Sequence, residues 1–211
     1  GNILEKIDDP ENEERFQVVV LSPDKQRGAR DMFLGSHANV ELDYLTLEIL
    51  ERTLLTTPVE LAPNGGAYAY AWSPDGNWLA FSDFDENDIL QVYRATVDGQ
   101  VVEQLTTHLQ DPGVIQIIEW SPNGQYIAYA AQAFLPTQYA HGGWIGLITL
   151  SDLQMVAINP DYFQYTRGLW WSEDNDLIAF VGEGFPEAPN ALDGTQIHWA
   201  DRNSGAILNS F

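Results

Sequence analysis

Acidic and amide side chains gather in one short stretch of the chain that could bind a cation. Asp83, Asp85, Asn87 and Asp88 supply hard oxygen ligands within six residues, and Ca²⁺ takes several such oxygens from one tight loop. The EF-hand pattern is not matched, because Asp88 stands where it requires glycine and Arg94 where it requires glutamate. Two interpretations stay open: a calcium site with Asp83, Asp85 and Asn87 as ligands, or a solvated acidic turn. No other cofactor is predicted.

Residues for nucleophilic or zinc-dependent catalysis are not arranged in a usable pattern. The sequence contains no G-x-S-x-G string and no cysteine. Its four histidines, His37, His108, His141 and His198, are too widely spaced for any two to form a zinc motif. We therefore expect isolated loop or surface histidines and a chain that is not an enzyme.

Two longer polar segments carry aromatic side chains that could bind a partner. The first, residues 132–143, contains Phe134, Tyr139 and His141, and the second, residues 182–194, contains Phe185 and Glu187. Long connections with exposed aromatic residues are often binding elements held by a rigid scaffold. These five residues are the predicted binding site, and the alternative is that the phenylalanines fold back as local plugs.

A repeated string shows which elements would position these residues. WSPDGNWLAF at Trp72 recurs as WSPNGQYIAY at Trp120 and WSEDNDLIAF at Trp171, and a degenerate copy, LSPD, begins at Leu21. The four starting points are separated by 51, 48 and 51 residues. Proline presets φ and glycine or asparagine accepts a positive φ, so each copy predicts strand, tight turn, strand. The turns would be scaffold, and the recurring tryptophans would pack between repeats.

Two more apolar runs follow each of the three clear copies, so each repeat predicts four antiparallel strands. Residues 40–55 could also be helical, but alignment of residues 54–57 with 104–107 favours strands. Four-stranded units repeating every 40 to 50 residues are typical of β-propeller blades. We therefore expect an all-β propeller chain with about four blades. The alternative is a β-sandwich, which would not explain the repeat period.

The chain is expected to form a single propeller region over residues 1–211. The predicted blades cover residues 16–57, 66–107, 114–159 and 166–211, after an outer strand and acidic linker at 1–15. GNILEKI at the N-terminus matches GQVVEQL at Gly99, which gives five outer strands for four sets of inner strands. Three explanations stay open: the chain is part of a longer propeller, a second copy completes an eight-bladed ring, or one strand is surplus. If the end blades are open, they would favour homo-oligomers.

Charge and hydropathy exclude several classes of partner. The net charge of −22 repels phosphate backbones and anionic bilayers, so no nucleic acid partner is expected. No run approaches the roughly 20 apolar residues of a membrane-spanning helix, so no membrane insertion is expected. The absence of cysteine leaves the compartment open.

The WSPDG-type turn, together with the aromatic and aliphatic strand that follows it, resembles the TolB-like, or WD40-like PD40, propeller repeat. The resemblance covers most of residues 16–211. It implies a periplasmic or extracellular location, and a protein-binding module of a bacterial envelope or signalling protein. Such blades also occur beside prolyl-oligopeptidase-type and tricorn-type peptidases and in some polysaccharide lyases. The alternative is therefore an accessory domain of a larger enzyme whose catalytic part lies elsewhere, and a third option is a spacer.

Overall fold

The computed structural model describes residues 19–33, 45–51, 59–62, 64, 68–108, 113–134, 141–184 and 195–210. These residues form strands, turns and connections, with no helix among them. In the same ranges there is accordingly no helix with the length and hydropathy to cross a membrane. The outer strand and linker predicted at 1–15 lie outside the described residues.

Within these ranges, fifteen strands build four antiparallel, four-stranded blades. The first blade consists of β1 (Val19–Leu21), β2 (Arg27–Phe33), β3 (Leu45–Glu51) and β4 (Val59–Leu61). The second consists of β5 (Tyr70–Trp72), β6 (Trp78–Phe84), β7 (Leu90–Thr96) and β8 (Val102–Gln104). The third and fourth contain β9 (Val114–Trp120), β10 (Tyr126–Phe134), β11 (His141–Thr149), β12 (Met155–Trp171), β13 (Leu177–Gly184), β14 (Thr195–Asp201) and β15 (Ile207–Ser210).

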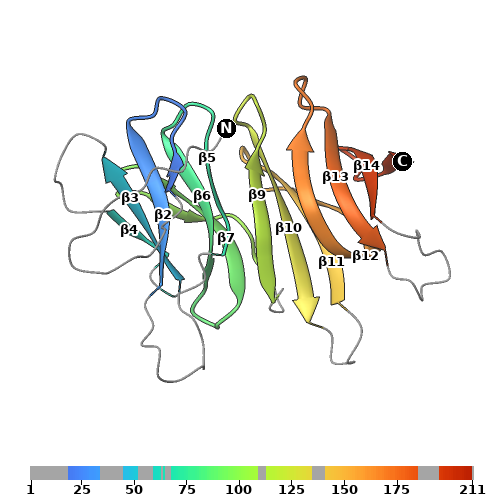
Figure 1. The fold of residues 1–211 in the computed structure, drawn as a ribbon, viewed down its shortest axis with the longest axis horizontal. Coiled ribbons are helices and arrows are strands. Elements are labelled where there is room, and N and C mark those ends of the chain that lie inside the picture. The colour runs from blue at the N-terminus through green and yellow to red at the C-terminus, as the bar shows by residue number, and fades with distance from the viewer. Residues whose placement is uncertain are drawn as a thin grey trace.

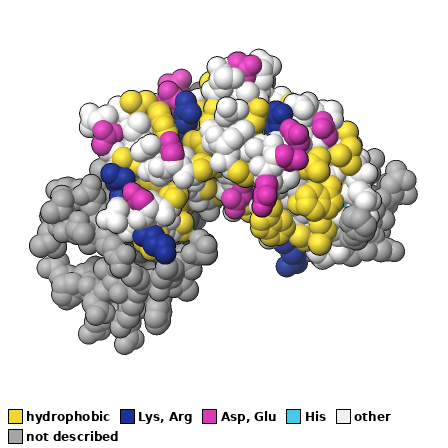
Figure 2. Space-filling model, turned by 90° about the horizontal axis from the view of Figure 1, so that it is seen from above, with side chains coloured by type: hydrophobic (Ala, Val, Ile, Leu, Met, Phe, Trp, Pro, Cys, Tyr) yellow, Lys and Arg dark blue, Asp and Glu magenta, His cyan; other side chains and the backbone are white. Residues whose placement is uncertain are grey.

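The long strand β12 belongs to two blades. It pairs with β11 at Met155–Ile158 and Phe163, and it pairs with β13 from Phe163 to Trp171. It is therefore the outer strand of the third blade and the inner strand of the fourth. Within each blade every strand pairs with its neighbours in sequence, so each blade is a simple meander. The blades stand side by side in Figure 1, and from above they follow an arc in Figure 2.

The predicted all-β propeller architecture is confirmed, including the strand interpretation within residues 40–55, where β3 lies. The end of the first blade differs from the prediction. Its fourth strand is Val59–Leu61, beyond the predicted boundary at 57. Pro58 has no N–H to give to a strand ladder, and the strand begins directly after it. Residues 54–57, on which the boundary was based, lie outside the described part of the chain.

The core consists of three apolar clusters, each joining two successive blades. Ala29 and Leu61 of the first blade pack with Trp72, Leu79 and Phe81 of the second. A second cluster joins blades two and three, and a third joins blades three and four. Burial of one Phe or Ile side chain contributes about 1.5–3 kcal/mol, so stacking of the blades is the main source of stability.

The three recurring tryptophans connect the blades by equivalent hydrogen bonds. The indole Nε1–H of Trp72 donates to the carbonyl oxygen of Val20 at 2.8 Å. Trp120 donates to Ala71 at 3.0 Å, and Trp171 donates to Glu119 at 3.2 Å. Each acceptor is the residue before the corresponding repeat position in the preceding blade. This confirms the prediction that the tryptophans pack between blades, and we call these three bonds the tryptophan clamps.

The four repeat turns share one hydrogen-bonding pattern. In the second blade the Ser73 hydroxyl donates to Asp75 Oδ1 at 2.6 Å and accepts the Trp78 N–H at 3.0 Å. Ser22, Ser121 and Ser172 bond in the same way to Asp24, Asn123 and Asp174. The positive φ falls on Lys25, Gly76, Gly124 and Asn175. The turns are thus structural, as predicted.

Candidate functional site

The blades present two faces with different connections. The turn face carries the four repeat turns, each of which joins the first and second strands of a blade. The loop face carries the connections between the second and third strands, and it is the lower edge in Figure 1. Phe134 and His141, the described members of the predicted binding site, end the two strands that flank one loop-face connection.

Two of the five predicted binding residues come together at the loop face. Phe134 is the last residue of β10 and His141 the first of β11, and these two residues are paired across the strands. The nine paired positions of this hairpin run without interruption from Tyr126 to Phe134, so the backbone at its end is well supported. Tyr139, Phe185 and Glu187 lie outside the described residues, although β13 ends at Gly184 on the same face.

The predicted calcium ligands lie at the loop face of the second blade. Oδ1 of Asp85 accepts the N–H groups of Asn87 at 2.8 Å and Ile89 at 3.0 Å. Its Oδ2 accepts the side-chain amide of Gln91 at 3.0 Å. Asp83 is buried on β6 and accepts the N–H of Asn64 at 3.3 Å. The Asp85 carboxylate thus organises the turn between β6 and β7.

Hydrogen bonding dominates the electrostatics of Asp85. Burial raises the pKa of its carboxyl group, but the bonds from Ile89, Asn87 and Gln91 outweigh burial and the pKa is lowered. Within the described ranges, no three His, Asp or Glu side chains are placed to hold a metal ion. The described geometry gives the acidic stretch a structural role as a turn, and calcium binding stays a prediction.

A polar network joins the second and third blades near the same face. Oε1 of Gln91 accepts the Thr106 hydroxyl at 2.7 Å and the His108 N–H at 2.9 Å, while its amide donates to the His108 carbonyl at 3.1 Å. Nε2 of His108 is 3.1 Å from the Tyr129 hydroxyl. Sequence reasoning did not find this network, because its residues come from three separate segments.

Burial shifts the pKa values of two side chains in this network. It lowers the pKa of His108 and raises the pKa of Tyr129, so both side chains are neutral at pH 7. The expectation of isolated surface histidines is therefore wrong for His108, and also for His198, which is fully buried and stacks on Phe180 at 5.0 Å. His37 lies outside the described residues. Neutral hydrogen-bonded rings at blade junctions stabilise the scaffold.

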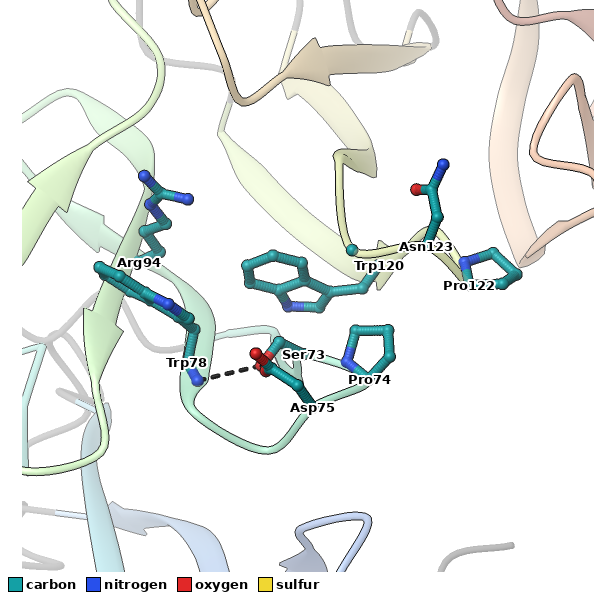
Figure 3. A pocket seen from close by; sticks show the side chains of 9 residues that line it. Ser73, Pro74, Asp75, Trp78, Arg94, Trp120, Pro122 and Asn123 are labelled. Atoms are coloured by element: carbon teal, nitrogen blue, oxygen red, sulfur yellow. Dashed lines mark hydrogen bonds between the residues drawn. The ribbon is translucent and has the colours of Figure 1, made fainter.

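The turn face contains a groove between the second and third blades. A hollow of about 410 Å³ lies between Trp78 and Arg94 on one side and Trp120 on the other (Figure 3). The Arg94 guanidinium lies 4.4 Å from the centre of the Trp78 ring and bonds to Glu103 at 2.6 Å. A second hollow of about 490 Å³ shares Arg94 and Gly124 with the first, so the two are adjacent.

The charged side chains that line the groove bond to other groups of the protein. Asp75, which lines the groove, accepts hydrogen bonds within its own turn. The bond from the Ser73 hydroxyl is the largest cause of the lowered pKa of the Asp75 carboxyl group. Arg94 is neutralised by Glu103. No sequence pattern predicts this groove, because Arg94 comes from the third strand of its blade and meets the turn residues only in the folded chain.

Comparisons with known proteins address the fold. No family profile matches the sequence, and no curated protein matches it. Solved structures do match. A protein designated TolB from Agrobacterium tumefaciens is 20% identical with a TM-score of 0.57, over 92% of this chain and 66% of that one. TolB from Acinetobacter baumannii is 15% identical with a TM-score of 0.51, over 90% and 43%.

A peptidase shares the same architecture. The acylaminoacyl peptidase of Pyrococcus horikoshii is 15% identical with a TM-score of 0.58, over 88% of this chain and 31% of the peptidase. The chain thus spans less than two thirds of the length of each of these three proteins. Together with the clamps and turns, these likenesses show that the chain has the β-propeller fold of TolB and of peptidase propellers.

Proposed function

We propose that this chain is a non-catalytic protein-binding β-propeller module of a bacterial envelope or signalling protein. The partner is held at the loop face by Phe134, Tyr139, His141, Phe185 and Glu187. The observation that carries the proposal is the end of the β10–β11 hairpin, where Phe134 and His141 oppose each other on a regular ladder. A rigid scaffold lowers the entropic cost of presenting such residues.

The described polar groups near this site support binding over catalysis. Asp85 is occupied by three donors, and Gln91 and Thr106 bond to one another. Such groups hold the scaffold and are not poised to exchange protons with a substrate. The resemblance to TolB, a periplasmic protein, supports a periplasmic or extracellular location.

The charge of the chain indicates the kind of partner. A net charge of −22 attracts a basic protein surface and accelerates its association. We therefore expect the partner to present Lys and Arg around an apolar centre that meets the aromatic residues. Binding to such a partner would weaken as salt is raised.

The test uses peptides selected by phage display against the immobilised chain. The tightest peptide is titrated calorimetrically against Phe134→Ala, Tyr139→Ala and Phe185→Ala, with Arg94→Ala in the turn-face groove as the control. Loss of an aromatic anchor should weaken binding about tenfold, whereas Arg94→Ala should leave the affinity unchanged. Unchanged affinity in all three loop-face variants, or loss in Arg94→Ala alone, would remove this site assignment.

The likeness to a peptidase supports a second candidate. Because the acylaminoacyl peptidase of P. horikoshii contains a region of the same fold, the chain could serve as a propeller accessory domain of a larger enzyme, a peptidase or a polysaccharide lyase. A G-x-S-x-G segment in the same reading frame, outside these residues, would favour the peptidase. Hydrolysis of acyl-peptide substrates by the chain alone would contradict its non-catalytic role.

A further inference from the structure

The groove on the turn face is bordered by two indole rings that are held apart. Trp78 and Trp120 line opposite sides of the hollow of about 410 Å³ (Figure 3). In the next junction Tyr126 and Trp171 stand at the same two repeat positions, and there the rings stack at 5.9 Å. Between the first and second blades, Arg27 stands at the position of Trp78. Of the three described junctions, only the one between the second and third blades therefore keeps two aromatic rings of these positions apart.

Both walls of the groove are fixed by contacts within the protein. The Arg94 guanidinium lies 4.4 Å from the centre of the Trp78 ring, and its Nε donates to Glu103 Oε2 at 2.7 Å. The Arg94 side chain is only 19% exposed, so it supports the ring from one side. On the other side, Trp120 is held by its clamp to Ala71. Walls that are ordered before binding lower the entropic cost of binding a ligand.

The groove offers a ligand apolar carbon atoms and hydrogen-bond donors. Trp120 uses its indole N–H in the clamp, so it offers only carbon atoms. A guanidinium has five N–H donors. Glu103 accepts from Nε and Nη2, which leaves the Nη1 of Arg94, within the described part of the chain, as a donor for a ligand. Pro74 and Pro122 are exposed on the rim and have no N–H. Such a surface suits a ligand with apolar rings and carbonyl acceptors.

A polyproline II segment has this chemistry. Its pyrrolidine rings are apolar, its carbonyl groups make no internal hydrogen bonds, and proline has no N–H to satisfy. Binding of such segments in grooves lined by aromatic side chains is a recurring mode of peptide recognition. The adjacent hollow of about 490 Å³, lined by Tyr126, Thr149 and Leu150 among others, lengthens the groove. The site can therefore hold several residues of an extended peptide.

Charge determines which residues suit the positions beside the prolines. The Asp75 carboxyl lines the groove, and the bond from the Ser73 hydroxyl is the largest cause of its lowered pKa, so it is ionised at pH 7. Arg94 is already paired with Glu103, and the chain carries a net charge of −22. An arginine beside the prolines is attracted to this surface, whereas an acidic segment is repelled.

We propose that the turn-face groove binds a polyproline II segment of a partner protein that carries arginine beside its prolines. Proline rings pack between Trp78 and Trp120, a peptide carbonyl accepts a hydrogen bond from Arg94, and the arginine side chain lies near Asp75. This site is on the face opposite to the loop-face site, so each of the two sites can be removed without the other.

The test is a calorimetric titration of the chain with a synthetic peptide of about ten residues in a repeating Pro-Pro-Arg order. A glycine–serine peptide with arginine at the same spacing controls for charge alone and should not bind detectably. Trp78→Ala should weaken binding of the proline–arginine peptide about tenfold, and Arg94→Ala should also weaken it. Trp170→Ala, at a tryptophan that is 53% exposed outside the groove, should leave the affinity unchanged, as should Phe134→Ala at the loop face.

A second variant keeps the test independent of any loss of folding in Trp78→Ala. Asp75→Asn retains side-chain acceptors like those of Asn123 in the third blade. It should weaken the proline–arginine peptide roughly two- to fivefold and leave the affinity for a peptide of prolines alone unchanged. Added salt should reduce the difference between these two peptides.

Four results would overturn the proposal. The first is a wild-type chain that binds neither proline peptide, and the second is equal binding of the glycine–serine peptide. The third is unchanged affinity in both Trp78→Ala and Asp75→Asn. The fourth is loss of binding in Phe134→Ala alone, which would assign the peptide to the loop face.

Discussion

Ser73 shows how one hydroxyl can organise a turn. It donates to Asp75 and accepts from Trp78, and it is almost fully buried. The equivalent bonds at Ser22, Ser121 and Ser172 show that the pattern survives replacement of most of the surrounding residues. The Ser and Asx positions therefore define the repeat more strictly than its proline or glycine.

Removing the Ser73 hydroxyl should be costly. Ser73→Ala leaves the Trp78 N–H without its side-chain acceptor and removes the hydroxyl donor to Asp75, which keeps its bonds from Asn77. Loss of one partner from a buried hydrogen bond costs about 1–3 kcal/mol. Asp75→Asn should cost less, because the Asn123 side chain accepts the equivalent hydrogen bonds in the third blade. Urea unfolding followed by tryptophan fluorescence measures both, and equal losses would contradict the assigned roles.

At the scale of elements, the junctions between blades combine apolar packing with one clamp. Glu119 is an exception in composition, because it places a carboxyl group between the third and fourth blades. Burial raises the pKa of Glu119. Its backbone carbonyl still accepts the clamp from Trp171, so the backbone role is independent of the side chain.

The raised pKa of Glu119 predicts a direction for the pH dependence of stability. A carboxyl whose folded pKa lies above its unfolded value favours folding when protonated, and this contribution is lost as pH rises through the folded pKa. Glu119→Gln, which cannot ionise, should therefore be more stable than the wild type at pH 7. The difference should vanish below pH 4. Free energies of unfolding from urea titrations at both pH values measure this, and a less stable variant at pH 7 would contradict it.

The elements that the sequence predicted are those encoded locally. The WSPDG-type strings contain all the atoms of their turns, so the turns and adjoining strands could be derived from residues within ten positions. The groove at Arg94 and the network at Gln91 and His108 could not, because they join segments 15 or more residues apart. No local pattern marks His108 as a partner of Tyr129.

The candidate site was predictable only in outline. Strand order alone places the segments around Phe134 and Phe185 on one face, because the second strand of each blade runs away from its turn. In the structure Phe134 and His141 are paired at the end of the β10–β11 hairpin, and their role in binding stays a prediction. Side-chain orientation within a long connection depends on packing that no periodicity encodes, so the arrangement of Tyr139, Phe185 and Glu187 stays a prediction.

At the scale of the molecule, the four blades act as repeated modules that interact with their neighbours. The second and third blades each contribute to two junctions, and the three core clusters among the described residues lie between successive blades. Such a chain stabilises itself by neighbour contacts in the manner of repeat proteins.

The tryptophan clamps are the central claim, and NMR hydrogen exchange tests them most directly. The chain has seven tryptophans, each with one assignable indole N–H resonance. We expect the indole protons of Trp72, Trp120 and Trp171 to exchange at least a hundredfold more slowly than in the urea-unfolded chain. Exchange of any of these three at the unfolded rate would contradict the stacked-blade account.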